Sequence, residues 1–92
     1  MIKSFRSKRL ERYWMRGDAR GLPSEHIKRL NTRLSALDVA ASPQEMNVPG
    51  WRFHALTGDM KGRWSVRITG NWRLTFAWHD PDAIDVDFED CH

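Results

Sequence analysis

The apolar positions in the first part of the chain recur every three or four residues. This spacing places them on one face of a helix and predicts two helices. The residues that follow it are Leu10, Tyr13 and Trp14 in one run and Ile27, Leu30, Leu34 and Leu37 in the next. The first helix is expected from Ser7, whose hydroxyl can cap it, to Met15. The second is expected to begin near Pro23 and to end by Ala40, with His26 and most of its basic residues on the exposed side.

From Trp51 onward the apolar residues alternate with polar ones, which is typical of strands that bury one face. The alternating segments are WRFHAL at 51–56, WSVRIT at 64–69, WRLTFAW at 72–78 and IDVDFE at 84–89. Gly70-Asn71 is a tight-turn dipeptide between two of them. Residues 2–6 read as a further short strand. We therefore expect an α+β fold, in which a short N-terminal strand and two helices pack on one face of a small antiparallel sheet.

The charge of the chain is unevenly distributed. Its 92 residues, which we expect to form a single domain over 1–92, carry a formal net charge of +3. Residues 1–37 hold ten Lys/Arg and three Asp/Glu, a net of +7, whereas residues 38–92 hold five and nine, a net of −4. The basic part suits a polyanion such as nucleic acid, although a solvated helix face would have the same composition.

The sequence offers no sign of export or of a membrane span. The opening MIKSFRSKRL lacks the apolar segment of a signal peptide. No apolar run approaches the roughly 18–20 residues of a membrane helix. A single cysteine excludes an internal disulfide. We therefore expect a cytoplasmic protein with no membrane partner.

The residues favour metal-independent cleavage of RNA over metal or thiol chemistry. Cys91 and His92 are adjacent, and no C-x-x-C or H-x-x-x-H spacing exists, so we expect no metal and no cofactor. Cleavage of RNA by its own 2′-OH needs a base, an acid, and cations for the charge that develops on the phosphate. Spacing alone does not choose among the candidates, which are His54, Lys61, Arg63, Arg73, Asp90 and His92.

Several stretches together resemble one known family. These are the opening MIKSF, the stretch FHALTGDMKGRWSVRITGNWRLTFAW and the ending FEDCH. They contain the motifs L-x-G-D, G-x-W-S-x, N-W-R-[IL]-x-F and E-D-x-H. In these motifs, and over nearly its whole length, the chain resembles the HigB toxins of bacterial toxin–antitoxin pairs, within the RelE/ParE superfamily. The resemblance implies a RelE-like fold of the microbial-ribonuclease type.

The resemblance also implies a function and its partners. HigB toxins are ribosome-dependent mRNA endonucleases that enter the A site of the small ribosomal subunit, cut the mRNA there and stop growth. The implied protein partner is a helix-turn-helix antitoxin of the HigA type. Operator DNA would be bound only through the complex with that antitoxin, as in plasmid maintenance systems.

The resemblance assigns roles to four residues of this chain. His54 matches a histidine of the active-site pocket, and Arg73 matches the arginine that faces the scissile phosphate. Asp90 and His92 match the acidic and histidine positions of the closing motif. The resulting hypothesis has His92, oriented by Asp90, as one acid–base group and His54 as the other. Which of the two is the base stays open.

Two positions depart from the family pattern. Thr57 stands where close relatives have lysine, and Cys91 stands where many have tyrosine. The first change removes a cation near the phosphate, for which Lys61 or Arg63 could substitute. The second replaces an aromatic ring that can stack on a base, a contact worth about 1–3 kcal/mol elsewhere. We therefore expect slower cleavage than in relatives that keep the lysine.

The basic residues of the two predicted helices are candidates for contacts with ribosomal RNA phosphates, which carry no sequence information. They are Lys8, Arg9, Arg12, Arg16, Lys28, Arg29 and Arg33. Two other functions stay open at this level. One is a ParE-like inhibitor of DNA gyrase without ribonuclease chemistry, and the other is an attenuated toxin that acts mainly with its antitoxin in operon autoregulation.

Overall fold

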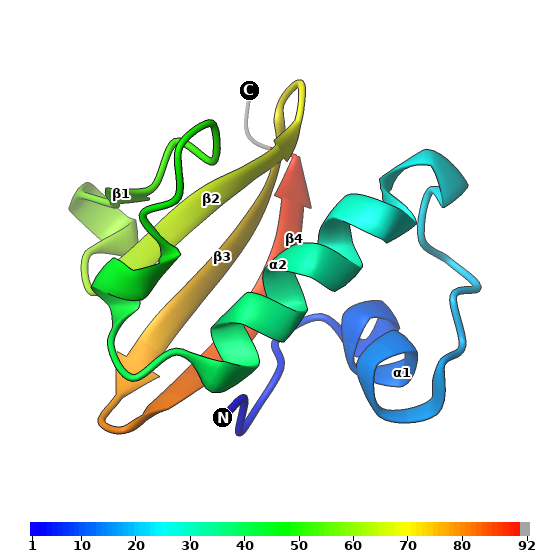
Figure 1. The fold of residues 1–92 in the computed structure, drawn as a ribbon, viewed down its shortest axis with the longest axis horizontal. Coiled ribbons are helices and arrows are strands. Elements are labelled where there is room, and N and C mark those ends of the chain that lie inside the picture. Colours follow the sequence, from blue (N-terminus) through cyan, green and yellow to red (C-terminus); the bar gives the residue numbers. More distant parts are fainter. Residues whose placement is uncertain (91–92) are drawn as a thin grey trace.

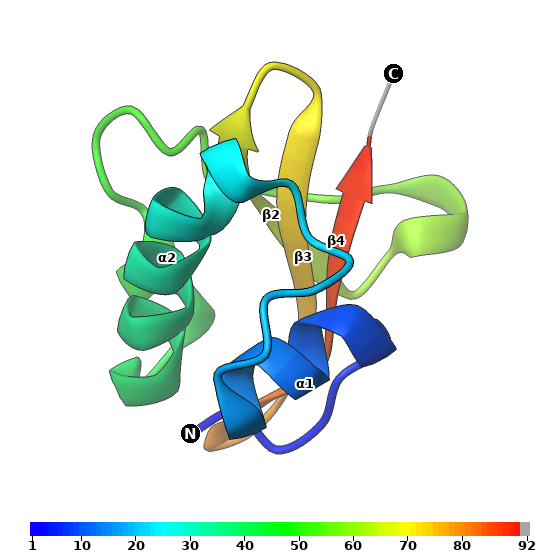
Figure 2. The ribbon, with the colours of Figure 1, turned by 90° about the vertical axis from the view of Figure 1, so that its right-hand side faces the viewer.

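Two helices and a sheet form two layers, with both helices on the same side of the sheet (Figures 1 and 2). The structure is a computed structural model, which describes residues 1–90. The helices are α1 (Lys8–Arg16) and α2 (Ile27–Val39), and the short 3-10 turns are η1 (Ser24–His26), η2 (Pro43–Met46) and η3 (Gly58–Met60). The strands are β1 (His54–Ala55), β2 (Arg63–Thr69), β3 (Trp72–His79) and β4 (Asp82–Asp90). This arrangement confirms the predicted α+β fold.

The sheet is an antiparallel meander in the order β1-β2-β3-β4. The predicted N-terminal strand forms only two isolated parallel bridges with β4, Ile2 with Ala83 and Phe5 with Val86. The strand expected at 51–56 is reduced to β1. Arg52 has a φ of 50°, and this left-handed conformation interrupts the extended backbone before His54. The edge strand is therefore short, which is one way in which sheets limit further pairing.

The first helix has both of the ends that its sequence predicts. The Ser7 hydroxyl accepts a hydrogen bond from the Leu10 amide at 3.2 Å, which satisfies a free N–H of the first turn. At the other end Gly17 has a φ of 71° and donates its N–H to the Tyr13 carbonyl at 2.8 Å. Glycine adopts this left-handed cap without steric cost. The predicted cap at Ser7 is confirmed.

The core lies between the helices and the near face of the sheet. The side chains that meet there are almost completely buried, and burial of such chains is the main stabilising contribution to the fold. The helices and η2 supply Leu10, Leu30, Leu34, Leu37 and Met46, and the strands supply Val66, Ile68, Leu74, Phe76, Val86 and Phe88. The strand alternation therefore predicted the buried face correctly.

Two residues expected on the exposed side of the second helix are buried instead. His26 is 6% exposed and packs against Trp72 and Phe88, with ring centroids 5.9 and 6.1 Å apart. Arg33 is 9% exposed, and its guanidinium lies 4.7 Å from the Trp51 ring centroid. Helical spacing gave both a polar position, but strand ends and a loop that are distant in sequence cover them.

Neither helix within residues 1–90 is long and apolar enough to cross a membrane.

Candidate functional site

Strand pairing gathers polar residues in rows on the open face, which we define as the sheet face turned away from α1 and α2. In one row His54 of β1 pairs with Ser65 of β2, Ser65 pairs with Thr75 of β3, and Thr75 pairs with Asp87 of β4. Residues opposite each other on antiparallel strands point to the same face. A histidine, two hydroxyls and a carboxylate therefore cross the whole sheet side by side.

The next row brings positive charge to the same face. Arg67 of β2 pairs with Arg73 of β3, and Arg73 pairs with Glu89 of β4. Two arginines directly opposite each other repel, so this pair is unfavourable unless an anion lies nearby. Buried Nη1 of Arg73 has no hydrogen-bond partner within residues 1–90. The row therefore contains a buried cationic donor that no described residue satisfies.

The polar side chains at the centre of the open face are buried, which is unusual for residues of this kind. Ser65 and Thr75 are both 0% exposed, and Arg63 is 6% exposed. Arg63 reaches diagonally across the sheet, and its Nη2 donates to Thr75 Oγ1 at 3.0 Å. Thr75 Oγ1 in turn donates to Glu89. A guanidinium, a hydroxyl and a carboxylate are thus joined in one hydrogen-bonded chain.

Some N–H donors of the Arg63 guanidinium are bonded and others are not. Its Nη2 also donates to the Asp85 carbonyl at 2.8 Å, whereas buried Nε and Nη1 have no partner within residues 1–90. Burial lowers the pKa of Arg63, and the neighbouring charge of Arg6 lowers it further. A buried cation with unused donors is costly.

His54 is held in one tautomer by two hydrogen bonds. Its Nδ1 lies 3.0 Å from the Arg52 carbonyl, which can only accept, so Nδ1 carries the proton. Its Nε2 lies 3.4 Å from Ser65 Oγ and is therefore the nitrogen with the lone pair. The exposed ring can take up a proton at Nε2, as a general base must.

Both non-glycine residues with positive φ within residues 1–90 hold a side chain of the open face. Arg52 and Asp85 each have a φ of 50°. The Arg52 carbonyl accepts from His54, and the Asp85 carbonyl accepts from Arg63. The Asp85 amide is fixed in turn by Ser4 Oγ at 2.9 Å. Left-handed conformations are unfavourable for such residues and often occur at functional sites.

Burial also affects the carboxylate at the end of the first row. It raises the pKa of Asp87, and the charge of Glu89 adds to this effect, whereas a hydrogen bond from the Phe88 amide and the charges of Arg63 and Arg6 oppose it. The carboxylate is therefore ionised less readily than an exposed one.

The structure brings together some of the predicted site residues. His54, Arg63 and Arg73 share the open face. Asp90 ends β4 opposite Trp72, one position after Glu89, so strand alternation places it on the other face of the sheet from Arg73 and His54. Lys61 is exposed and directly follows η3, which projects on the side of the sheet opposite α2 (Figure 2). Cys91 and His92 lie outside the described residues, so their predicted roles stay predictions.

The predicted RNA-binding residues of the helices differ in exposure. Six of them are exposed: Lys8, Arg9, Arg12, Arg16, Lys28 and Arg29. Arg33 is different, because it is buried and its Nε donates to the Arg67 carbonyl at 2.8 Å. Its side chain joins α2 to β2, and little of it remains available to an RNA phosphate on the helix surface.

Ser65, Thr75 and Glu89 are functional candidates that were not predicted from the sequence. Each occupies a polar position of an alternating strand, so the parity of the strands was a signal for all three. What the sequence did not reveal was the burial of the two hydroxyls or their bonds to His54, Arg63 and Glu89.

Within residues 1–90, no three His, Cys, Asp or Glu side chains lie close enough to hold a metal ion together. The described side chains of the open face are suited instead to an anion near a general base. His54, Arg63 and Arg73 belong to this one face of the sheet, and each of the two arginines has a buried donor without a partner within residues 1–90.

Two helices on one face of a four-stranded antiparallel sheet are consistent with the RelE-like class of toxins. The chain belongs to the HigB-like toxin family, because residues 3–92 match the model described as "RelE-like toxin of type II toxin-antitoxin system HigB". Membership of a type II family implies an antitoxin as a partner. The resemblance found in the sequence motifs is confirmed.

Two curated relatives agree with this assignment. The chain is 39% identical over 92 residues to "Endoribonuclease HigB" of Proteus vulgaris, and the match covers 100% of both chains. It is 34% identical over 89 residues to "Toxin HigB-1" of Vibrio cholerae serotype O1, which covers 94% of this chain and 93% of that protein.

Proposed function

We propose that this toxin is an endoribonuclease that cuts mRNA in the A site of the ribosome without a metal ion. The observation that carries the proposal is the open face, where His54 Nε2 has its lone pair and two arginines have unused donors. The name of the Proteus vulgaris relative, which is similar over the whole chain, supports endoribonuclease activity. The fold would act as one toxin domain over residues 1–92.

The reaction is a transesterification within the RNA. His54 Nε2 takes the proton of a ribose 2′-OH, and the 2′-oxygen attacks the neighbouring phosphorus. The bond from phosphorus to the 5′-oxygen breaks, and that oxygen takes a proton from a general acid. The products are a 2′,3′-cyclic phosphate and a free 5′-OH. We assign the acid to His92, with Asp90 to orient it.

The arginines stabilise the transition state in this proposal. Charge builds on the phosphate oxygens as the 2′-oxygen attacks, and fixed donors that meet this charge lower the barrier. Arg73 takes this role. Arg63 adds a second guanidinium that Thr75 and the Asp85 carbonyl already hold in place. Because these donors are fixed before the substrate binds, no energy is needed to orient them during the reaction.

The proposed function requires several partners. The small ribosomal subunit and its mRNA would be bound in the cytoplasm, with the exposed basic residues of α1 and α2 near ribosomal RNA phosphates. We propose a helix-turn-helix antitoxin of the HigA type as the neutralising partner. Operator DNA would be bound only through the antitoxin complex.

The test is cleavage of a defined mRNA in a translating extract. Wild-type protein should cut the mRNA only when ribosomes are present. Arg73→Ala should lower the cleavage rate by about 10²–10³-fold, which is the usual effect of removing one transition-state donor. His54→Ala should also lower it, and Lys3→Ala, which changes an exposed residue outside the site, should not. Full cleavage by both site variants would overturn the assignment.

One departure from the family pattern favours a weaker activity. Thr57 is exposed just before η3 and has no positive charge, whereas the family pattern has a lysine there. An attenuated toxin would cut mRNA slowly while it still binds its antitoxin. Growth after induction without antitoxin distinguishes the cases, and inhibition of gyrase supercoiling with intact mRNA would favour the ParE-like alternative.

A further inference from the structure

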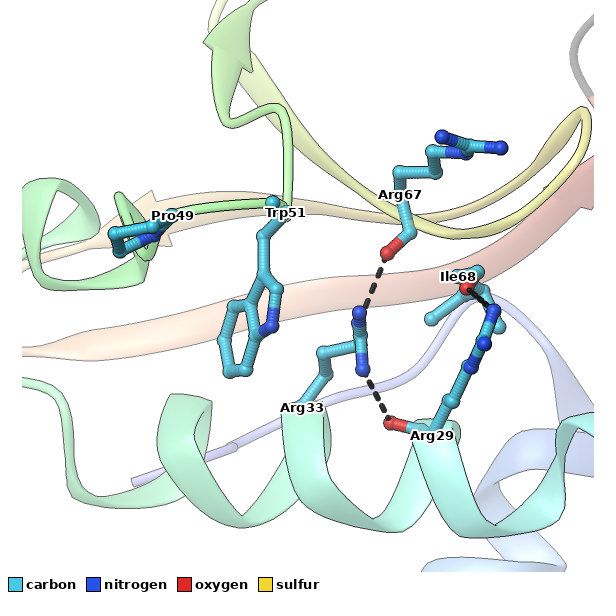
Figure 3. Close-up of a pocket in the computed structure, with 7 residues that line it drawn as sticks. Arg29, Arg33, Pro49, Trp51, Arg67 and Ile68 are labelled. Carbon is cyan, nitrogen blue, oxygen red and sulfur yellow. Dashed lines mark hydrogen bonds between the residues drawn. The ribbon is translucent and has the colours of Figure 1, made fainter.

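A basic pocket lies next to α2, on the side of β2 opposite to the open face (Figure 3). It has a volume of about 460 Å³ and is bordered by α2, by the end of β2 and by the loop that precedes β1. Its lining residues are Arg29, Arg33, Pro49, Gly50, Trp51, Arg67 and Ile68. Two of these, Arg29 and Arg33, bring a guanidinium to the pocket and none is acidic, so the pocket favours an anion.

The guanidiniums of the pocket are bound only to neutral groups in the described structure. Arg33 donates from Nε to the Arg67 carbonyl at 2.8 Å and from Nη1 to the Arg29 carbonyl at 3.4 Å. Arg29 donates from Nη1 to the Ile68 carbonyl at 3.1 Å. Carbonyls orient the two side chains without cancelling their charge. Burial lowers the pKa of Arg33, and the charge of Arg29 lowers it further.

The pocket wall is held rigidly by Trp51. Its ring lies under Arg33, with 4.7 Å from the guanidinium carbon to the ring centroid, and its carbonyl accepts from the Arg67 amide at 2.6 Å. The loop is thereby joined to β2, and Arg33 is held between the ring and the strand. Cations fixed in this way lose little side-chain entropy when they bind a ligand.

Arg67 connects the pocket with the open face. Its carbonyl turns toward Arg33, whereas its side chain points away, to the face where it pairs with Arg73 (Figure 3). Arg67 therefore contributes its backbone to the pocket and its guanidinium to the open face. A strand of RNA carries a phosphate at every nucleotide, so charge complementarity favours it as the ligand of a pocket that holds two guanidiniums and no carboxylate.

We propose that this pocket binds a phosphate of the RNA strand, upstream or downstream of the phosphate that is cut. The choice of ligand rests on the proposed function. Arg29 is the main contact, because it is exposed and uses only Nη1 among its donors in a bond within residues 1–90, and the buried Arg33 adds a second positive charge. The pocket would position the strand and would take no part in the chemical step.

The experiment uses the full chain and a hexauridylate whose 2′-oxygens are methylated, so that it cannot be cut. Binding is followed by NMR at the Trp51 indole N–H and the Arg33 Nε–H. Both signals should shift as RNA is added. Arg29→Gln should weaken binding about tenfold, as expected for loss of a charged hydrogen bond. It should also lower the slope of log K against log salt by about 0.7, the value for one phosphate on a single strand.

Lys3→Gln is the matched control, since it removes one exposed positive charge away from the pocket. It should change the affinity less than twofold. Equal losses in Arg29→Gln and Lys3→Gln would overturn the proposal, because the effect would then be one of net charge. So would RNA binding that leaves the Trp51 and Arg33 signals unmoved.

A second pair of variants avoids any loss of the bond from Arg29 to Ile68. Pro49 is exposed on the pocket rim, so Pro49→Glu adds a carboxylate to that rim, and Pro49→Gln differs from it only in charge. The carboxylate should weaken RNA binding several-fold relative to the amide. Equal affinities would count against the pocket.

The outcome separates this proposal from the proposed function. If hexaglutamate binds the pocket as tightly as the RNA does, the pocket is a site for an acidic protein segment and the RNA assignment fails. If Arg29→Gln binds RNA normally while wild-type protein cuts mRNA, the pocket fails and the function stands. If RNA binds the pocket but wild-type protein leaves mRNA intact, the function fails and the pocket stands.

Discussion

The two faces of the same sheet have opposite physical character. On the face covered by α1 and α2, the strand side chains are apolar and fill a closed core. On the open face Ser65 and Thr75 are buried just as deeply, but they are polar, and Arg63 lies among them with unused donors. Both faces belong to the same strands, so strand propensity does not explain the difference.

The two faces contribute to stability in opposite ways. An apolar face gains free energy from every buried group. Buried donors without partners lose free energy, and native proteins retain few of them. On the open face Arg63 and Arg73 have donors without partners within residues 1–90, on the same face of the sheet as His54. We read this cost as the consequence of a site that is arranged for an anion before the anion arrives.

The largest loss of stability is expected from a substitution on the helix-covered face. Phe76→Ala should lower the free energy of unfolding by about 3–5 kcal/mol, because it removes a fully buried ring and leaves a cavity. Urea denaturation followed by circular dichroism measures this. Phe76→Leu, which conserves more of the volume, should cost clearly less. Similar stability in wild type and Phe76→Ala would show that the core does not depend on this face.

The next largest loss of stability is expected when a polar side chain of the open face is made apolar, or an apolar side chain of the core is made polar. Thr75→Val leaves Arg63 without its hydroxyl acceptor and Glu89 without a donor, and should cost about 1–3 kcal/mol. The mirror variant Val66→Thr buries a hydroxyl in the apolar core and should cost a similar amount. Urea denaturation measures both. A neutral or stabilising Thr75→Val would mean that the hydrogen-bonded chain on the open face is dispensable.

Adding a cation near the open face should raise the rate of cleavage without changing stability. Thr57→Lys restores the charge of the family pattern, and we expect cleavage in the translating extract to rise about tenfold, less than for a buried donor because Thr57 is exposed. Stability should not change, since the residue has no core contact. Thr57→Gln has a similar length without the charge and should give no gain. Equal rates in the lysine and glutamine variants would contradict the prediction.

The smallest effect concerns the charge of Asp87. Burial raises its pKa, so the folded protein holds this proton more tightly than the unfolded chain. The free energy of unfolding should therefore fall as the pH rises from the ordinary aspartate pKa of 3.8 through the raised pKa of the folded state. Asp87→Asn removes this loss and keeps the acceptor for the Phe88 amide. We expect Tm at pH 7 to rise by roughly 1–3 °C.

The gain in Tm should shrink as the pH is lowered below the usual range of a carboxylate, because the wild-type group is then protonated as well. Thermal scans at several pH values measure this. A gain that is the same at all pH values would show that the charge of Asp87 is not its cause.

Much of the fold followed from local sequence signals. The Ser7 cap, the helical spacing of Leu30, Leu34 and Leu37, and the alternation of the strands all predicted what the structure contains. Each of these signals acts within a few residues along the chain. The site could be predicted in part, because strand alternation placed Arg73 on the polar face of the sheet.

The burial of His26 and Arg33 did not follow, because it depends on distant partners. Trp72 and Phe88 cover the first, and Trp51 and the Arg67 carbonyl hold the second. A helical pattern reports which side of a helix is apolar on average. It does not report which loop or strand end will come to lie against a polar residue.

The sequence by itself determined the elements, the apolar face of the sheet and the basic character of the first part of the chain. Only the tertiary structure decided the register. It shifts between Arg67 and Thr69 and again between Thr75 and Ala77, so that the two hydroxyls lie opposite each other between His54 and Asp87. A shift by one residue turns a strand to its other face, and long-range packing selects among registers that local propensity does not distinguish.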